Sequence, residues 1–115
     1  MSIEDPSTVD FLAIERGGTK LVLAISDHWE WSQPLDHVYA LQEKMNTYAA
    51  FVESGQVWES ASEQSGRNIC PDSIPIEVKV FLKFEPPPVF FEFMERAKIA
   101  FAALGVSVTH ALRTE

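Results

Sequence analysis

Asp10, Asp27 and His28 are the side chains in this sequence most able to do acid/base chemistry. Asp27 and His28 are adjacent, and Asp10 lies on the other strand of a predicted hairpin, diagonal to Asp27 on the same face. Diagonal neighbours in a hairpin are about 7–8 Å apart at their Cα atoms. Two carboxylates at that separation can share a proton or bind a divalent cation, and a histidine can transfer protons. The trio is therefore a candidate site for an acid/base or metal-assisted hydrolase.

A structural role for these residues is the competing interpretation, and we favour it. Aspartate commonly closes a turn by accepting backbone N–H groups, which is the role we expect for Asp27. The sequence holds a second Asp–His dipeptide, Asp36-His37, but the two dipeptides match no defined metal-ligand spacing. The hydrolase remains the alternative function.

Signatures of zinc, nucleophile and phosphate sites are missing from the sequence. His28, His37 and His110 are widely separated, and Cys70 is the only cysteine, so no ligand pair has the spacing of a zinc site. Gly17-Gly18 is too short to cradle a phosphate, and no G-x-S-x-G motif is present. We therefore predict no metal and no cofactor, a solvent-facing Cys70 thiol, and His110 partly buried or at the rim of the core.

A β-hairpin over residues 9–26 is the element that would position the two aspartates. Gly17-Gly18 is typical of a two-residue hairpin loop, because glycine accepts positive φ at both central positions. Positions equally distant from these glycines then pair, which places Leu12 opposite Leu23 and Ile14 opposite Leu21. The large apolar residues alternate onto one face and the smaller ones onto the other.

A helix over residues 34–54 is predicted next, from apolar residues that recur at steps of three and four. Ser32 is its expected N-cap and Gly55 its expected stop. Residues 56–73 are rich in Ser, Gly, Gln and Asn and are expected to form a partly mobile loop. Within that segment, Val57-Trp58 is expected to form a short strand or to pack back on the core.

The sequence pattern in the last third of the chain predicts a strand, then a helix, then a second strand. Apolar residues alternate over 74–84, prolines 86–88 can start a helix that ends at Gly105, and alternation returns over 106–112. The order β-β-α-β-α-β predicts an α+β two-layer sandwich with a four-stranded mixed sheet and both helices on one face. We expect a single domain over residues 1–115.

The second sheet face is the clearest clue to function. It collects apolar residues with lysines between them: Val9, Phe11, Ala13, Val22, Ala24, Phe81 and Ala111, with Lys20, Lys79 and Lys83. A solvated sheet face normally carries polar residues, and contiguous apolar patches mark interaction sites. The sequence therefore predicts a non-enzymatic domain that self-associates or binds a protein through this face. Coverage of the face by residues 56–73 is the alternative.

Trp29 and Trp31 are candidate interface residues as well. They are two apart in the loop that follows the hairpin, and in an extended loop we expect the two rings to point in roughly opposite directions, one into the core and one exposed. The competing interpretation is that both rings seal the end of the hairpin against the first helix.

Charge excludes some classes of partner. Nine Lys and Arg against seventeen Asp and Glu give a net charge of −8, which disfavours nucleic acid and anionic membranes and leaves a basic protein as one option. The start of the chain is polar and acidic, unlike a secretory signal, and the longest apolar stretch, Phe101 to Val108, is far shorter than the ~20 residues that span a bilayer. With a single cysteine, a cytoplasmic protein is expected.

Several short segments resemble an uncharacterised family of small bacterial proteins, known only as a domain of unknown function. They are Val9-Asp10-Phe11, Ile25-Ser26-Asp27-His28 with Trp31, Leu41-Gln42-Glu43-Lys44, Phe51-Val52-Glu53-Ser54-Gly55 and Lys83-Phe84-Glu85-Pro86. The similarity covers most of the chain except roughly residues 58–73. It implies a small bacterial cytosolic domain, and no activity, cofactor or catalytic residue comes with it.

Overall fold

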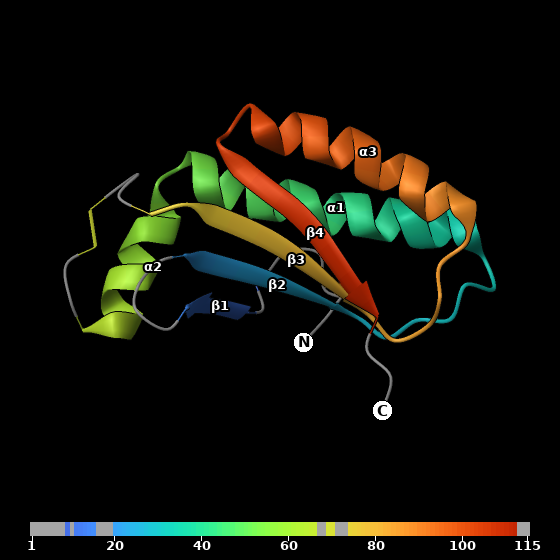
Figure 1. Ribbon diagram of the computed structural model, residues 1–115, viewed down its shortest axis with the longest axis horizontal. Coiled ribbons are helices and arrows are strands. Elements are labelled where there is room, and N and C mark those ends of the chain that lie inside the picture. Colours follow the sequence, from blue (N-terminus) through green and yellow to red (C-terminus); the bar gives the residue numbers. More distant parts are fainter. Residues whose placement is uncertain (1–8, 10, 16–19, 67–68, 71–73, 113–115) are drawn as a thin grey trace.

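Four strands and three helices make up the fold in the computed structural model, which describes residues 9, 11–15, 20–66, 69–70 and 74–112. In chain order they are β1 (Phe11–Ile14), β2 (Leu21–Asp27), α1 (Pro34–Glu53), α2 (Gln56–Ser65), β3 (Ile76–Leu82), α3 (Pro88–Ala102) and β4 (Val106–Leu112). The sheet order is β1-β2-β3-β4, with β1 antiparallel to β2 and the other neighbours parallel. Helices α1 and α3 lie side by side along the sheet (Figure 1). The predicted α+β architecture with a mixed sheet is confirmed, with one helix more than expected.

The register of the first two strands is the one that the sequence predicted. Leu12 pairs with Leu23 and Ile14 with Leu21. The backbone N–H of Glu15 donates to the carbonyl of Lys20 at 2.8 Å, next to the predicted turn. The glycine pair Gly17-Gly18 itself lies outside the described residues. Pairing and alternation agree, so each apolar set occupies a single face of the sheet.

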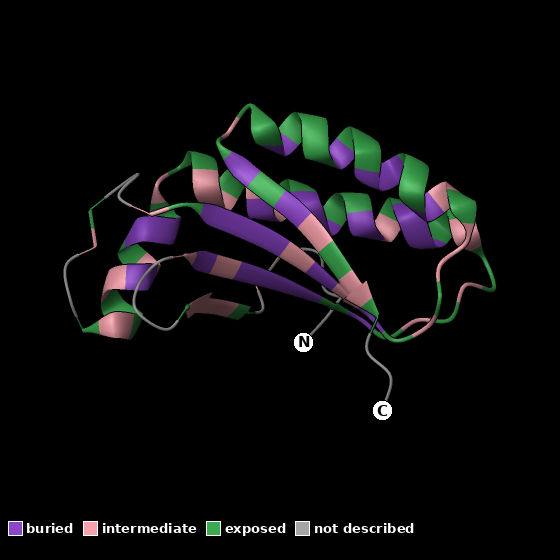
Figure 2. Ribbon diagram, in the orientation of Figure 1, coloured by how far each residue is buried: buried purple, intermediate pink, exposed green. Residues whose placement is uncertain are grey.

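The core lies between the sheet and the helices. The parallel register sets Leu23 beside Val78 and Ile25 beside Val80, and all four side chains are fully buried. Against them pack the buried residues of α1 and α3, among them Leu41, Met45, Tyr48, Phe90, Met94 and Phe101. Figure 2 shows buried residues along the sheet and on one side of each long helix. Strand β2 is a near-continuous apolar run, as parallel strands covered by helices often are, whereas β3 alternates apolar residues with Glu77 and Lys79.

Helix α2 corrects the expectation of a loop over residues 56–73. Gly55 and Gly66 flank it, both in the left-handed conformation, with φ of 83° and 72°. Its apolar residues Val57, Trp58 and Ala61 are buried in the same core as α1. Spacing of one and four residues places these three on one helical face, and the polar residues between them occupy the exposed face. Three apolar residues are too few to predict a helix from the sequence of a segment whose composition is typical of loops.

The start of α1 also differs from the sequence prediction. Gln33, not Ser32, is the N-cap, and its side chain makes no capping hydrogen bond. Pro34 occupies the first helical position, where a missing N–H costs nothing, and this fixes the cap one residue later than Ser32. The helix ends at Glu53, just before Gly55, as expected.

Candidate functional site

Asp27 ends β2 at the edge of the sheet where all three parallel strands end. In the register it pairs with Leu82 of β3, which pairs with Leu112 of β4. The carbonyl of Asp27 accepts the backbone N–H of Lys83 at 2.9 Å. Ligands of open sheets with parallel strands bind outside these carboxyl ends, so this edge is where a site is expected.

The Asp27 carboxylate is bonded to the imidazole of His37 in the first turns of α1. Asp27 Oδ2 and His37 Nε2 are 2.6 Å apart, and each residue is only 2% exposed. The other carboxylate oxygen, Oδ1, accepts the backbone N–H of Trp29 at 3.1 Å. A side chain that accepts the N–H two residues on forms an Asx-turn, so the turn role expected for Asp27 is confirmed.

Burial raises the pKa of the Asp27 carboxyl above its ordinary value of 3.8. Removal from water disfavours the charged form, and this is the largest influence. The hydrogen bond with His37 and the N–H of Trp29 act in the opposite direction. A buried carboxylate needs such partners, because an unpaired charge in the interior is strongly destabilising.

Two tryptophans enclose the His37 ring. Trp31 stacks on it, with ring centroids 3.6 Å apart and planes 12° from parallel, and Trp29 meets it edge-on at 5.5 Å. The indole N–H of Trp31 donates to the carbonyl of Phe84 at 3.4 Å. Both indoles are half-buried and contact the same ring, so the expectation that they point apart, one into the core and one into solvent, is wrong. The two indoles lie close together because both pack against the His37 ring at the start of α1.

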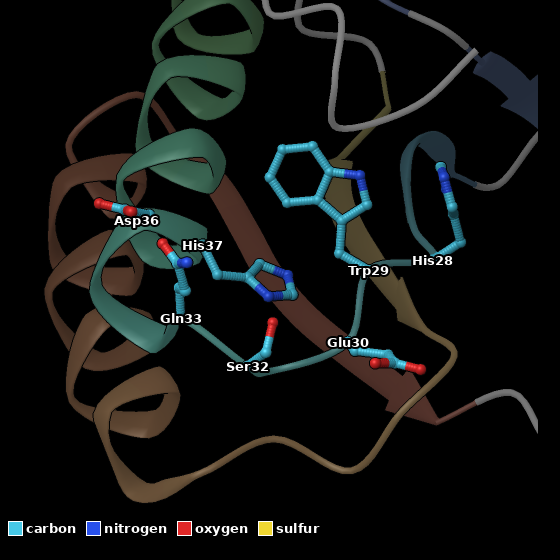
Figure 3. A pocket seen from close by; sticks show the side chains of 7 residues that line it. All are labelled: His28, Trp29, Glu30, Ser32, Gln33, Asp36 and His37. Carbon is cyan, nitrogen blue, oxygen red and sulfur yellow. The ribbon is translucent and has the colours of Figure 1, made fainter.

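A pocket of about 430 Å³ opens beside His37, at the start of α1. His28, Trp29, Glu30, Ser32, Gln33, Asp36 and His37 line it (Figure 3). In that view the Ser32 hydroxyl points toward the His37 ring. The second ring nitrogen of His37, Nδ1, is buried and has no hydrogen-bond partner within the described part of the chain. Buried polar atoms are nearly always bonded, so an unsatisfied one needs an explanation.

The predicted trio Asp10, Asp27 and His28 stays a prediction. Asp10 lies outside the described residues, and His28 is exposed. The histidine bonded to Asp27 is His37. A signal was present, because His37 precedes Leu41 by four residues and so belongs to the buried stripe of α1, where a histidine needs a polar partner. Among the described residues no group of three or more His, Cys, Asp and Glu side chains is placed to hold a metal ion.

The remaining single residues lie near their expected places. Cys70 is exposed. His110 is exposed at the end of β4, with its ring 5.3 Å from that of Phe90 and 5.6 Å from that of Phe91, which corresponds to a rim position.

The second sheet face carries an apolar half and a polar half. Along one row Phe11 pairs with Ala24, Ala24 with Lys79, and Lys79 with Thr109. Phe11 is 55% exposed, while Val22 and Phe81 are half-buried. The predicted apolar face is therefore concentrated on β1 and β2, and polar residues of β3 and β4 continue it.

Val9 is the exception among the interface residues predicted on the second sheet face. It is half-buried and packs against the core. Strand β1 begins only at Phe11, so the alternation that would place Val9 on the second face does not reach it. Helix α2 also joins the core, and its Gln64 amide donates to the Leu12 carbonyl at 2.8 Å. Coverage of the second face by residues 56–65 is therefore excluded.

An ion pair lies in the polar half of the second face. Lys20 Nζ is 2.7 Å from Glu77 Oε1, and the Thr109 hydroxyl donates to Glu77 Oε2. The hydrogen bond from Lys20, followed by that from Thr109, lowers the pKa of Glu77 below its ordinary value of 4.5. Nearby, the Lys79 ammonium lies 5.5 Å from the centre of the Phe81 ring. The charges of Lys20 and Glu77 thus neutralise each other, while Lys79 keeps its positive charge beside the Phe81 ring.

The fold and the site together define a small α+β domain with a buried Asp–His pair at the carboxyl edge of its sheet. The chain belongs to DUF6572, a family of unknown function, whose family model matches residues 1–114. The predicted membership of a family of unknown function is confirmed. The comparisons found no curated protein and no solved structure that match the chain. None of the helices in the described part of the chain has the length and apolar character needed to cross a membrane.

Proposed function

We propose that this protein is a non-enzymatic domain that binds a second copy of itself through the second sheet face, which is the face away from α1 and α3. The observation that carries the proposal is the exposure of Phe11, 55%, beside the half-buried Ala13 and Val22 on a face away from α1 and α3. Exposed apolar residues that are contiguous mark interaction sites, and isologous dimers are the commonest oligomers.

The polar half of this face is suited to burial as well. Lys20 and Glu77 neutralise each other, so an interface that covers them encloses no unpaired charge. Lys79 keeps its alkyl chain on the sheet and its ammonium near the Phe81 ring. In each copy of the dimer, these polar side chains of the second sheet face thus already make contacts within their own chain.

Charge favours a second copy over a basic protein at this face. The chain carries a net charge of −8, so two copies repel each other. The second sheet face presents Lys79 and the neutral Lys20–Glu77 pair, so contact through it brings no excess of carboxylates together. A basic partner would be steered to the acidic surface elsewhere.

Phe11→Asp tests this proposal by light scattering on the eluting protein. We expect the wild type to have the mass of a dimer and the variant that of a monomer, because a carboxylate cannot be buried unpaired at the centre of the contact. Leu35→Asp is the matched control: Leu35 is 74% exposed on α1, away from the face, and its change should leave the dimer intact. A monomeric wild type, or a variant with unchanged mass, contradicts the proposal.

The hydrolase stays as a second candidate, with His37 in place of His28. Its support is the carboxylate–imidazole hydrogen bond of 2.6 Å beside a pocket, since an oriented imidazole can act as a general base. A panel of activated esters, assayed with the wild type and His37→Gln, tests it. Turnover that the variant loses supports hydrolysis, and equal rates contradict it.

We also propose a cytoplasmic location. The one cysteine of the sequence, Cys70, is exposed, and an exposed thiol is compatible with a reducing compartment. Fractionation of the native host, followed by immunodetection, tests this directly.

A further inference from the structure

The unused nitrogen of His37 is the starting point, and it is separate from the second sheet face. His37 is 2% exposed, and its Nε2 is occupied by Asp27. Its Nδ1 has no partner among the described residues, although His37 lines the pocket at the start of α1. A buried polar atom that borders a pocket is suited to a hydrogen bond with a ligand.

The surroundings of Asp27 decide which kind of hydrogen bond Nδ1 can make. Asp27 Oδ1 accepts the N–H of Trp29, and acceptance of an N–H favours the ionised carboxylate. Opposite an ionised Oδ2, we assign His37 the tautomer with its proton on Nε2, which donates to Oδ2 across 2.6 Å. The Nδ1 atom of the same neutral ring then has a lone pair and no proton, so it is an acceptor. The group that it binds must be a donor.

The walls of the pocket select for positive charge. Glu30 and Asp36 contribute carboxylates on opposite sides of His37 (Figure 3). Trp29 contributes an indole ring, and aromatic faces attract cations. The volume of about 430 Å³ falls within the range of small-molecule sites.

We propose that this pocket binds a small organic cation that carries N–H donors, such as a primary amine. One N–H of the ammonium donates to His37 Nδ1, the Trp29 ring lies against the cation, and Asp36 and Glu30 supply the negative field. The acceptor selects for N–H groups, and the two carboxylates select against anions.

Benzylamine is the probe, titrated into the full chain at about pH 8, above the ordinary pKa of histidine. Two-dimensional NMR follows the Trp29 indole N–H and the backbone amides of residues 28–37. We expect saturable shifts at these signals. Tetramethylammonium, a cation without N–H, and benzoate, an anion, should each bind at least about tenfold more weakly.

Three variants locate the binding. Trp29→Leu should weaken benzylamine binding about tenfold and Asp36→Asn about threefold, from loss of the ring and of one charge. Glu43→Gln removes an exposed carboxylate of α1 outside the pocket and should leave the affinity unchanged. His37→Phe keeps a ring for Trp31 to stack on and should abolish binding; if it does not fold, Trp29→Leu and Asp36→Asn still decide.

Four results overturn the proposal. They are no saturable shift with benzylamine, benzoate bound as tightly as benzylamine, tetramethylammonium bound as tightly, and equal affinities for Asp36→Asn and Glu43→Gln. The mass of the protein is measured in the same samples, so failure of the dimer and failure of this site are seen separately.

Discussion

The Asp27 carboxylate and the His37 imidazole join the end of β2 to the first turns of α1 through a buried hydrogen bond of 2.6 Å. The nine residues between them, 28–36, include the turn that carries both tryptophans, and Trp31 stacks on the histidine. The pair therefore fixes the path of the chain from the sheet to the helix layer. Its energetic cost is that a carboxylate is held away from water.

Asp27→Asn should change how stability depends on pH. Burial raises the pKa of Asp27 above 3.8, so the folded protein binds this proton more tightly than the unfolded chain. Relative to the variant, the wild type is then most stable below that value and loses stability as pH rises through the raised pKa. Asparagine keeps an acceptor for the Trp29 N–H and places a donor near His37.

Urea unfolding of both proteins from about pH 3 to about pH 8 measures this difference. The free energy of unfolding of the wild type minus that of Asp27→Asn should fall as pH rises. A difference that grows with pH would mean that the hydrogen bonds to the ionised Asp27 carboxylate outweigh the cost of its burial, contrary to the direction stated here.

Glu77→Gln should give the opposite pH dependence. Lys20 and Thr109 lower the pKa of Glu77 below 4.5, so its contribution to stability is present above that value and is lost as pH falls through the lowered pKa. The same unfolding series should show a wild-type advantage at neutral pH that disappears in acid. Glu92→Gln, an exposed carboxylate on α3, is the control and should show no such change.

Tyr48→Phe should destabilise the fold by about 1 kcal/mol, the usual contribution of one intramolecular hydrogen bond. The fully buried Tyr48 hydroxyl donates to the carbonyl of Ala24 at 2.5 Å, which ties α1 to β2. Tyr39→Phe on the same helix is the control, because Tyr39 is 63% exposed. Thermal melts that shift equally for both variants would argue that this bond contributes nothing.

Trp58→Ala should destabilise the protein by about 3 kcal/mol, as loss of a large core side chain does. Trp58 is 7% exposed and belongs to the core although it lies on the short helix α2. Glu59→Ala, its exposed neighbour, should change the free energy of unfolding by less than about 0.5 kcal/mol. If the two variants have the same midpoint in urea, α2 is not part of the cooperative fold.

Local pattern alone determined much of this protein. The pairing of Leu12 with Leu23, the strand over residues 76–82 and the helices that begin at Pro34 and Pro88 follow from alternation, helical spacing and proline, which act between neighbours in the sequence. Family membership followed from the same segments. Its bacterial origin stays a prediction.

Only the tertiary structure decided which distant side chains meet. The sequence placed Asp27 beside His28, but α1 folds back over the sheet and brings His37 to the carboxylate, with both tryptophans around it. Tertiary packing also makes the polar segment Gln56–Ser65 a helix, because the burial of Trp58 stabilises a conformation that the local composition disfavours. Burial and long-range hydrogen bonds depend on neighbours far away in the chain, and no spacing rule carries that information.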